Sequence, residues 1–478
     1  MNVINAAGLC LGLAAVLGGA LAPKEAHAQT KLVFAHYMVC FPTYNDGVAG
    51  YERDIKDAQK YGIDGFALNC GEWNDFYQKN VAQMFEAAEH LHTGFKLFFS
   101  ADMSGLKAPE ILAMMQKYSG NPYYFKYKGR PVLSTFSGQA QTGSMGRANA
   151  AWWKDNVLNP LKTSKVDVYF LPYFYPDPIS EMPGKDRIKA NLNGKVEHDD
   201  GTGYTGWWGD VADGMFFFGA TGMPSYDSSP SLLKASEDYA DVMHANGKEF
   251  MGAVSPQYWG RVQTNGRRYF EYEGPIGLKA QWESIIQKQH PEWIEMVTWN
   301  DFNESYISPI DDAYKHWPNF TSAGPGYYHS HEGLAELNAY YIDWYKHYSP
   351  KHAPPFPGKT DNMFWAYRTT PMDAPGVDDQ YGKVTLFHGP AADTIYFVAM
   401  LKSPATLKVT SGSKVTSIEV PAGISPVRVP FNVGKQTFEL IRGGKTIVTA
   451  SGEDVVEKFV SEGKNVYNFW YSSGSARG

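Results

Sequence analysis

Two carboxylates three residues apart, Asp301 and Glu304, follow a strongly apolar run at residues 293–297. The segment that carries them, residues 298–305, has the sequence TWNDFNES. The run before it has the length and the aromatic and branched content of a buried strand. Carboxyl groups at the end of a strand can act as the general acid and general base that glycosidic hydrolysis requires. The same spacing also fits a helix N-terminus, where Asp caps the helix and Glu completes a capping box.

If the pair is catalytic, its two members stand at different distances from the strand. Asp301 is nearer the strand and suits the base that activates water, whereas Glu304 is further out and suits the acid. The reverse assignment fits the same spacing. The chain has no HExxH motif, paired CxxC motifs or calcium-loop spacing, so we expect no metal and no other cofactor.

The segments that would position this pair alternate between strand-like runs and amphipathic helical patterns from Lys31 onward. Eight such runs within about 300 residues predict an α/β fold of the (β/α)8 TIM barrel type. An open doubly wound sheet is the alternative, and it is disfavoured because no Gly-rich phosphate loop follows the first run. The strand-like runs are residues 32–39, 65–69, 96–101, 131–136, 167–174, 214–218, 249–254 and 293–299. The helical patterns are residues 51–61, 76–91, 109–118, 231–245, 278–289 and 332–345.

A barrel of this kind carries its active site at the carboxyl ends of its strands, so side chains there are candidates for substrate binding. His36 is either a substrate contact or a hydrogen-bonded side chain within the barrel. Tyr258 and Trp259 are either a stacking platform or buried under a loop. The amide of Asn300 could fix a substrate hydroxyl or orient a carboxylate. The expected substrate-binding residues are His36, Asn69, Asp75, Asp102, Tyr173, Tyr258, Trp259, Trp299 and Asn300, and Asp177 and Ser255 also follow predicted strands.

The amino-acid composition indicates which kinds of partner the protein could bind. The chain has 13 Trp, 31 Tyr and 27 Phe, and these aromatic residues make up 15% of its 478 residues. Flat rings pack protein cores, but they also stack on the faces of sugars. The net charge is −7, with Lys and Arg scattered along the chain. This charge argues against nucleic acid or an anionic membrane surface as a partner, because either favours a basic patch.

The first 28 residues have the features of an export signal. Residues 6–22 are apolar and small, and Ala26-His27-Ala28 forms an A-x-A cleavage site. No later run reaches the roughly 18 apolar residues that a membrane span needs. We expect cleavage after Ala28 and a mature chain that is secreted or periplasmic.

The character of the sequence changes after the last helical pattern. We assign residues 29–349 to the catalytic barrel, the Pro-rich range 350–372 to a linker, and residues 373–478 to an accessory β-sandwich. The last range has short strand-like runs separated by turn residues, and it lacks an acid cluster. Those runs are residues 383–387, 394–400, 406–410, 415–420, 427–431, 436–441 and 445–450.

Cys40 and Cys70 each close a predicted strand. If the two strands are neighbours, the α-carbons of these cysteines could fall within disulfide range. An oxidising compartment would permit the bond. The alternative is a pair of small buried thiols.

Several ordered blocks of the chain resemble glycoside hydrolase family 71, the family of endo-α-1,3-glucanases or mutanases. The similarity runs from residue 31 to about residue 450, and blocks in matching order are more specific than any single block. The blocks are residues 33–39, 54–59, 62–69, 95–103, 254–256, 297–305 and 420–423.

This resemblance implies inverting endo-hydrolysis of α-1,3-linked glucan, so the expected partner is a polysaccharide. It implies that Asp301 and Glu304 are the catalytic Asp-x-x-Glu pair of the family. A further functional acid of the family is matched by Asp75, with Asp102 as the second choice. The two cysteines stand where the family usually has Gly or an aliphatic residue, so the rim near the first two strands departs from the family pattern.

Two other functions compete with this one. A related barrel glycosidase acting on another α-linked glycan, such as an endo-α-mannosidase, carries a Glu-x-x-Glu pair, and Asp301 argues against it. An inactive barrel that only binds carbohydrate would not need an intact acid pair with polar and aromatic residues around it. We expect the protein to act as a monomer.

Overall fold

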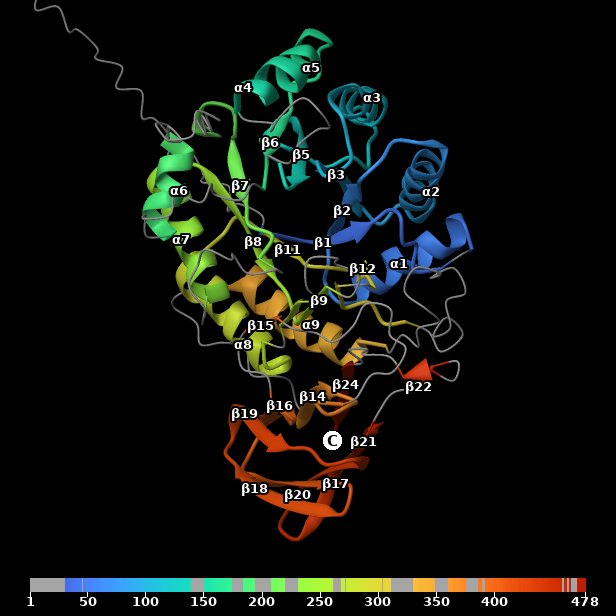
Figure 1. Ribbon diagram of the computed structural model, residues 1–478, viewed down its shortest axis with the longest axis vertical. Helices are drawn as coiled ribbons and strands as arrows, with labels where there is room; N and C mark the ends of the chain where they lie inside the picture. The colour runs from blue at the N-terminus through green and yellow to red at the C-terminus, as the bar shows by residue number, and fades with distance from the viewer. Residues whose placement is uncertain are drawn as a thin grey trace, which may run out of the picture. The chain divides into compact units, whose positions relative to one another are not determined.

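The computed structural model contains a curled parallel sheet and several separate antiparallel sheets (Figure 1). Among the residues that it describes, no helix is both long enough and apolar enough to cross a membrane. The described residues are 31–44, 46–138, 150–173, 184–193, 208–219, 231–260, 268–270, 272–302, 304–310, 330–348, 360–374, 386–388, 392–457, 460–461, 464–465 and 471–478.

Eight parallel strands of the described chain form the curled sheet, in the order β7-β8-β11-β1-β2-β3-β5-β6. Each of them falls within or closely overlaps one of the eight runs predicted to be strands. A short strand, β4 (Lys126–Tyr127), pairs antiparallel with β5. The eight strands are β1 (Leu32–Met38), β2 (Gly65–Cys70), β3 (Lys96–Asp102), β5 (Arg130–Phe136), β6 (Tyr169–Leu171), β7 (Gly214–Phe216), β8 (Glu249–Val254) and β11 (Trp293–Met296).

The first and the last of these strands in chain order are neighbours in space. β1 pairs with β11 in parallel, beginning with Leu32 opposite Trp293. β6 and β7 stand at the two ends of the strand order. The backbone N–H of Asp213, just before β7, donates to the carbonyl of Phe170 in β6 over 2.9 Å. The sheet is therefore strongly curled, and its carboxyl edge brings together the segments that follow β1, β2, β3 and β11.

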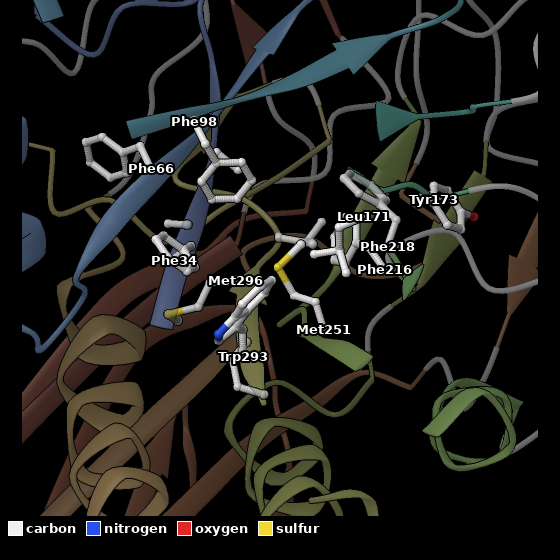
Figure 2. Close-up of a cluster of buried hydrophobic side chains, with 14 of the residues drawn as sticks. Phe34, Phe66, Phe98, Leu171, Tyr173, Phe216, Phe218, Met251, Trp293 and Met296 are labelled. Carbon is white, nitrogen blue, oxygen red and sulfur yellow. The ribbon is translucent and has the colours of Figure 1, made fainter. Parts of the chain in front are cut away.

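Runs of consecutive apolar residues explain why these segments form parallel strands. A parallel sheet is covered on both faces, and nearly every side chain of β1, β2 and β3 is buried. Figure 2 shows aromatic rings gathered in the core, where Phe34 meets Phe98 edge-to-face with ring centroids 4.9 Å apart. Tyr173 stacks on Phe218 with a centroid distance of 5.9 Å. Much of the high aromatic content thus packs the core.

The helices follow the strands and cover the parallel sheet (Figure 1). α2 begins at a well-formed cap, because the Asn74 side chain accepts hydrogen bonds from the backbone N–H groups of Phe76 and Tyr77. His92, the residue that follows the helix and caps its C-terminus, has a left-handed conformation. The helices are α1 (Val48–Lys60), α2 (Asp75–Leu91), α3 (Ala108–Tyr118), α4 (Ala150–Trp153), α5 (Asn159–Thr163), α6 (Gly184–Asn193), α7 (Ser231–Ala245), α8 (Pro275–Ser284) and α9 (Glu332–His347), with shorter turns η2 (Lys154–Leu158), η3 (Trp208–Asp210) and η4 (Ile285–Gln289).

The antiparallel strands after α9 form two four-stranded sheets, with the orders β19-β16-β14-β24 and β18-β17-β20-β21. β14 lies inside the range 350–372 that was predicted to be a linker. The consecutive apolar residues at 363–367 form this strand, and the Pro-rich stretch before them hid its pattern. The strands are β14 (Asn362–Arg368), β16 (Thr394–Leu401), β17 (Ala405–Ser411), β18 (Lys414–Val420), β19 (Gly423–Pro430), β20 (Gly434–Arg442), β21 (Lys445–Val455) and β24 (Tyr471–Arg477).

Smaller sheets complete the described chain. β15 was predicted as part of the sandwich, but it pairs in parallel with β10 in a three-stranded sheet that also contains β9. These strands are β9 (Tyr258–Gly260), β10 (Arg268–Phe270) and β15 (Leu386–His388), and two further pairs are β12 (Asn300–Asp301) with β13 (Ser305–Tyr306) and β22 (Val460–Ser461) with β23 (Lys464–Asn465).

Helix α9 packs directly on β24. A β-carbon added at Gly333 would lie only 2.2 Å from the carbonyl carbon of Gly474, so the two backbones touch where neither residue has a side chain. Arg477 forms an ion pair with Glu336 over 3.0 Å at the same junction. The first antiparallel sheet is thus joined to the helical layer by close backbone packing.

Candidate active site

Asp301 and Glu304 lie on a tight hairpin that follows β11. β12 pairs antiparallel with β13, with Asp301 opposite Ser305, and the backbone N–H of Glu304 donates to the Asp301 carbonyl over 3.0 Å. The Thr298 hydroxyl accepts a hydrogen bond from the backbone N–H of Asp301 (2.7 Å). The helix-capping interpretation of this segment is therefore wrong, because a hairpin turn stands where that helix would begin.

The two carboxyl groups differ in exposure. Asp301 is buried, with 6% of its surface exposed, whereas Glu304 is half-buried. The Tyr258 hydroxyl donates a hydrogen bond to Oε1 of Glu304 over 3.1 Å, and Tyr258 itself is completely buried. Tyr258, predicted as a stacking platform or a buried side chain, therefore contacts one of the two candidate catalytic groups directly.

Asn300 ties the hairpin to the loop after β1. Its Oδ1 accepts from the backbone N–H of Met38 (2.7 Å), and its Nδ2 donates to the carbonyls of Met38 (3.1 Å) and Phe41 (2.6 Å). The side chain is completely buried. Its amide thus holds two backbone segments together, which differs from both roles predicted for it.

A buried aspartate in α1 holds the neighbouring Trp299. The indole N–H of Trp299 donates to Oδ1 of Asp54 (2.8 Å), and the Tyr37 hydroxyl donates to Oδ2 (2.8 Å). Burial raises the pKa of Asp54 to about 7, although both hydrogen bonds act in the opposite direction. Asp54 was not among the predicted site residues. The signal was an acid within the apolar face of a helix, beside Ile55 and Ala58.

His36 and Glu295 form a buried pair between β1 and β11. Nδ1 of His36 lies 2.5 Å from Oε1 of Glu295, and both side chains are almost fully buried. The His36 carbonyl also accepts the backbone N–H of Trp299 (2.7 Å). Burial raises the pKa of Glu295, and the contact with His36 only partly offsets this effect. His36 is therefore a hydrogen-bonded side chain inside the sheet. Glu295 was missed, although a charge within the run 293–297 was a visible signal.

The Cys40 thiol lies near both Asp301 and Asp102. Burial raises the pKa of Cys40 to about 12, with further contributions from the charges of Asp301 and Asp102 and an opposing hydrogen bond from Tyr77. Asp102, at the end of β3, therefore lies near the hairpin that carries Asp301 and Glu304. Cys40 and Cys70 are both free thiols. Within the described ranges, no three His, Cys, Asp or Glu side chains are grouped as metal ligands would be.

Nearly the whole sequence matches a known family. The model of glycosyl hydrolase family 71 matches residues 29–478. The chain belongs to this family. It is 30% identical to a mutanase of Penicillium rubens over 456 residues, which cover 93% of this chain and 89% of the relative. It is 26% identical to the glucan endo-1,3-alpha-glucosidase agn1 of Schizosaccharomyces pombe, over 92% of this chain and 93% of the relative.

The similarity of this family 71 member to solved structures is weaker than its similarity to these relatives. The GH99 endo-alpha-mannosidase from Bacteroides thetaiotaomicron is 13% identical, with a TM-score of 0.44, and the match covers 66% of this chain and 97% of that one. The membership in family 71 makes the protein a glycosyl hydrolase, which requires a pair of groups able to act as acid and base.

The other predicted substrate-binding residues of this family 71 hydrolase lie in different parts of the structure. Asn69, at the end of β2, is buried, and its carbonyl accepts the backbone N–H of Val39. Tyr173 is a core residue, whereas Asp75 is exposed in the first turn of α2. The structure thus groups Asp301, Glu304, Tyr258, Cys40 and Asp102, while Tyr173, Trp299 and Asn300 hold the scaffold. Trp259 is part of β9 with its side chain outside the described part of the chain, Asp177 lies outside the described residues, and Ser255 is buried against Gln281.

Proposed function

We propose that this family 71 glycosyl hydrolase cleaves α-1,3-linked glucan at internal bonds, with Asp301 and Glu304 as the catalytic carboxyl groups. The observation that carries the proposal is the hairpin after β11, which holds both groups at the carboxyl edge of the parallel sheet. The names of the relatives, a mutanase and a glucan endo-1,3-alpha-glucosidase, support the choice of substrate.

In the proposed reaction, the two carboxyl groups act on opposite faces of one sugar ring. Glu304 donates a proton to the leaving glycosidic oxygen, and Asp301 takes a proton from the water that attacks the anomeric carbon. The contacts of the hairpin support these roles, because Tyr258 orients Glu304 and Thr298 holds the backbone of Asp301. Such a single displacement inverts the α-linkage and releases a β-configured product.

We also propose that the curled sheet closes into a (β/α)8 barrel between β6 and β7. The backbone hydrogen bond from Phe216 to Pro172 (3.0 Å), beside the one from Asp213 to Phe170, supports this closure. In this proposal the catalytic part spans residues 29–349, and the antiparallel sheets form an accessory module. The enzyme would be exported, cleaved after Ala28, and active as a monomer.

Hydrolysis of insoluble α-1,3-glucan by the purified protein tests the function. We expect the wild type to release reducing ends, and we expect Asp301→Asn and Glu304→Gln each to reduce the rate by about 10²–10⁴-fold, since each removes a proton-transfer group. Glu86→Gln is the matched control, because it removes a carboxylate from the exposed part of α2 and should keep the activity. No product from wild type, or wild-type rates in both hairpin variants, would contradict the proposal.

The stereochemistry has a separate test. Proton NMR of the first product formed from a soluble α-1,3-linked oligosaccharide should detect the β-anomer before mutarotation. An initial α-anomer would instead assign a retaining reaction, with one of the two carboxylates as a nucleophile.

A further inference from the structure

One exposed aromatic side chain stands apart from the aromatic core. Five large hydrophobic side chains of the described chain are exposed, and Phe76 is the aromatic one among them, with 50% of its surface exposed. The other four are Met372, Val415, Val433 and Val456. Phe76 is the second residue of α2, which follows the carboxyl end of β2. It therefore lies on the side of the parallel sheet that carries the catalytic hairpin.

A short series of contacts connects Phe76 with the candidate active site. The Phe76 ring meets the Tyr77 ring edge-on, with centroids 5.9 Å apart. The side chain of Tyr77 and the charge of Asp301 both influence the pKa of the Cys40 thiol, which places this thiol between them. The Tyr77 hydroxyl and a carboxylate oxygen of Asp102 also lie on the same side of Gly71, at 3.5 Å and 4.0 Å from the position of a β-carbon there.

The backbone that carries Phe76 is held in place by local hydrogen bonds. Oδ1 of Asn74 accepts from the backbone N–H groups of Phe76 (3.1 Å) and Tyr77 (3.2 Å). The Gln78 side chain donates to the Trp73 carbonyl (2.9 Å). Because this backbone is already fixed, a ligand that binds on the ring does not have to order the turn, which lowers the entropic cost of binding.

We propose that Phe76 is a stacking platform for a glucosyl unit of the glucan, at a subsite beyond the catalytic carboxyl groups. The apolar C–H face of a glucose ring matches the flat face of an exposed aromatic side chain. The exposed carboxylate of Asp75, in the same helical turn, can accept hydrogen bonds from the hydroxyls at the edge of that ring. This inference rests on the proposed function, and it adds a determinant of chain-length preference to it.

The test compares Phe76→Ala with wild type on soluble α-1,3-linked oligosaccharides of increasing length. We expect KM to rise about 3- to 10-fold for the oligosaccharides long enough to reach Phe76, from the loss of one stacking contact. The shortest hydrolysed oligosaccharide should keep its KM, and kcat should stay within about twofold of wild type. Phe76→Trp should restore the low KM, and Val433→Ala, which truncates an exposed apolar side chain elsewhere, should have no effect.

A second measurement separates this inference from the proposed function. Asp301→Asn protein, which would not degrade the polymer, should bind insoluble α-1,3-glucan in a pull-down assay. The double variant Asp301→Asn/Phe76→Ala should bind to a smaller extent. Active wild type with a KM that Phe76→Ala leaves unchanged at every length would overturn the inference and leave the proposed function standing. A wild type that neither binds nor cleaves the glucan would overturn both.

Discussion

Asp54 in α1 and Asp361 beside β14 are almost equally buried, with 1% and 4% of their surfaces exposed, yet they have opposite kinds of partner. Asp54 accepts hydrogen bonds from an indole and a phenol, which are neutral. Asp361 accepts two hydrogen bonds from the guanidinium of Arg442, over 2.8 Å and 3.0 Å. Burial raises the pKa of Asp54 to about 7, whereas the hydrogen bonds from Arg442 lower the pKa of Asp361.

This difference shows that burial alone does not set the direction of a pKa shift. Neutral partners leave the cost of burying a charge largely uncompensated, and a bidentate cation offsets it. The consequences for stability have opposite signs. Asp361 stabilises the fold above its unfolded pKa of about 3.9, and this contribution is lost as the pH falls through its lower folded value. Asp54 makes the fold less stable as the pH rises from about 4 to about 7, because the folded state retains its proton longer.

The largest expected effect comes from removal of the cation in the antiparallel region. Arg442→Met leaves the buried carboxylate of Asp361 without its bidentate partner, and we expect the free energy of unfolding at pH 7 to fall by about 3–5 kcal/mol. Urea denaturation would measure this change. Asp361→Asn in the same protein should recover part of the loss, because it removes the charge that was left unpaired. A decrease below about 1 kcal/mol in the single variant would show that the ion pair contributes no more than a surface pair.

The next effect is a change of pH dependence in the parallel region. Asp54→Asn removes the group whose pKa rises to about 7. The free energy of unfolding of the variant, relative to that of wild type, should therefore increase by about 2–4 kcal/mol between pH 4 and pH 8. Urea denaturation at a series of pH values would measure the difference. Glu52→Gln, on the same helix but half-buried, is the control and should keep the wild-type slope. If the free energy of unfolding changed with pH equally in wild type and Asp54→Asn, Asp54 would already be ionised at pH 4.

The smallest effect concerns the hairpin with the proposed catalytic pair, where Glu304 also accepts a hydrogen bond from a neutral phenol, that of Tyr258. Tyr258→Phe removes that hydroxyl, and we expect kcat to fall about 3- to 10-fold, since one hydrogen bond contributes about 0.5–1.5 kcal/mol. KM should stay near the wild-type value, because Tyr258 is buried and acts through Glu304. A raised KM with unchanged kcat would place Tyr258 in the substrate-binding surface instead, and steady-state kinetics separates the two outcomes.

Much of the framework could be predicted from the sequence, because continuous apolar runs are typical of parallel strands that are buried on both faces. All eight predicted strands are present, and Asp301 and Glu304 follow the last of them at the carboxyl edge of the sheet. β14 was assigned to a linker because a Pro-rich stretch precedes it. The hairpin could not be distinguished from a capping box, since both place two acids three residues apart.

The roles of individual polar residues were harder to predict. Asp54 and Glu295 become important only because distant segments bring Trp299 and His36 against them. Asn300 was expected at the substrate or at a carboxylate, but its amide binds the backbone after β1. Spacing along the chain does not encode these contacts. They depend on which strands become neighbours and on which face each side chain occupies.

The pairing of β1 with β11 has a consequence for the order of events during folding. His36 and Glu295 are 259 residues apart in the chain, and Asn300 bonds the backbone of Met38 across 262 residues. Contacts of such high sequence separation require closure of a very long loop and form slowly compared with helices and local turns. The hairpin with Asp301 and Glu304 has its anchors on β1, so it reaches its final geometry only after these most distant strands have met. The proposed catalytic pair therefore reaches its working geometry late, once the nonlocal topology is complete.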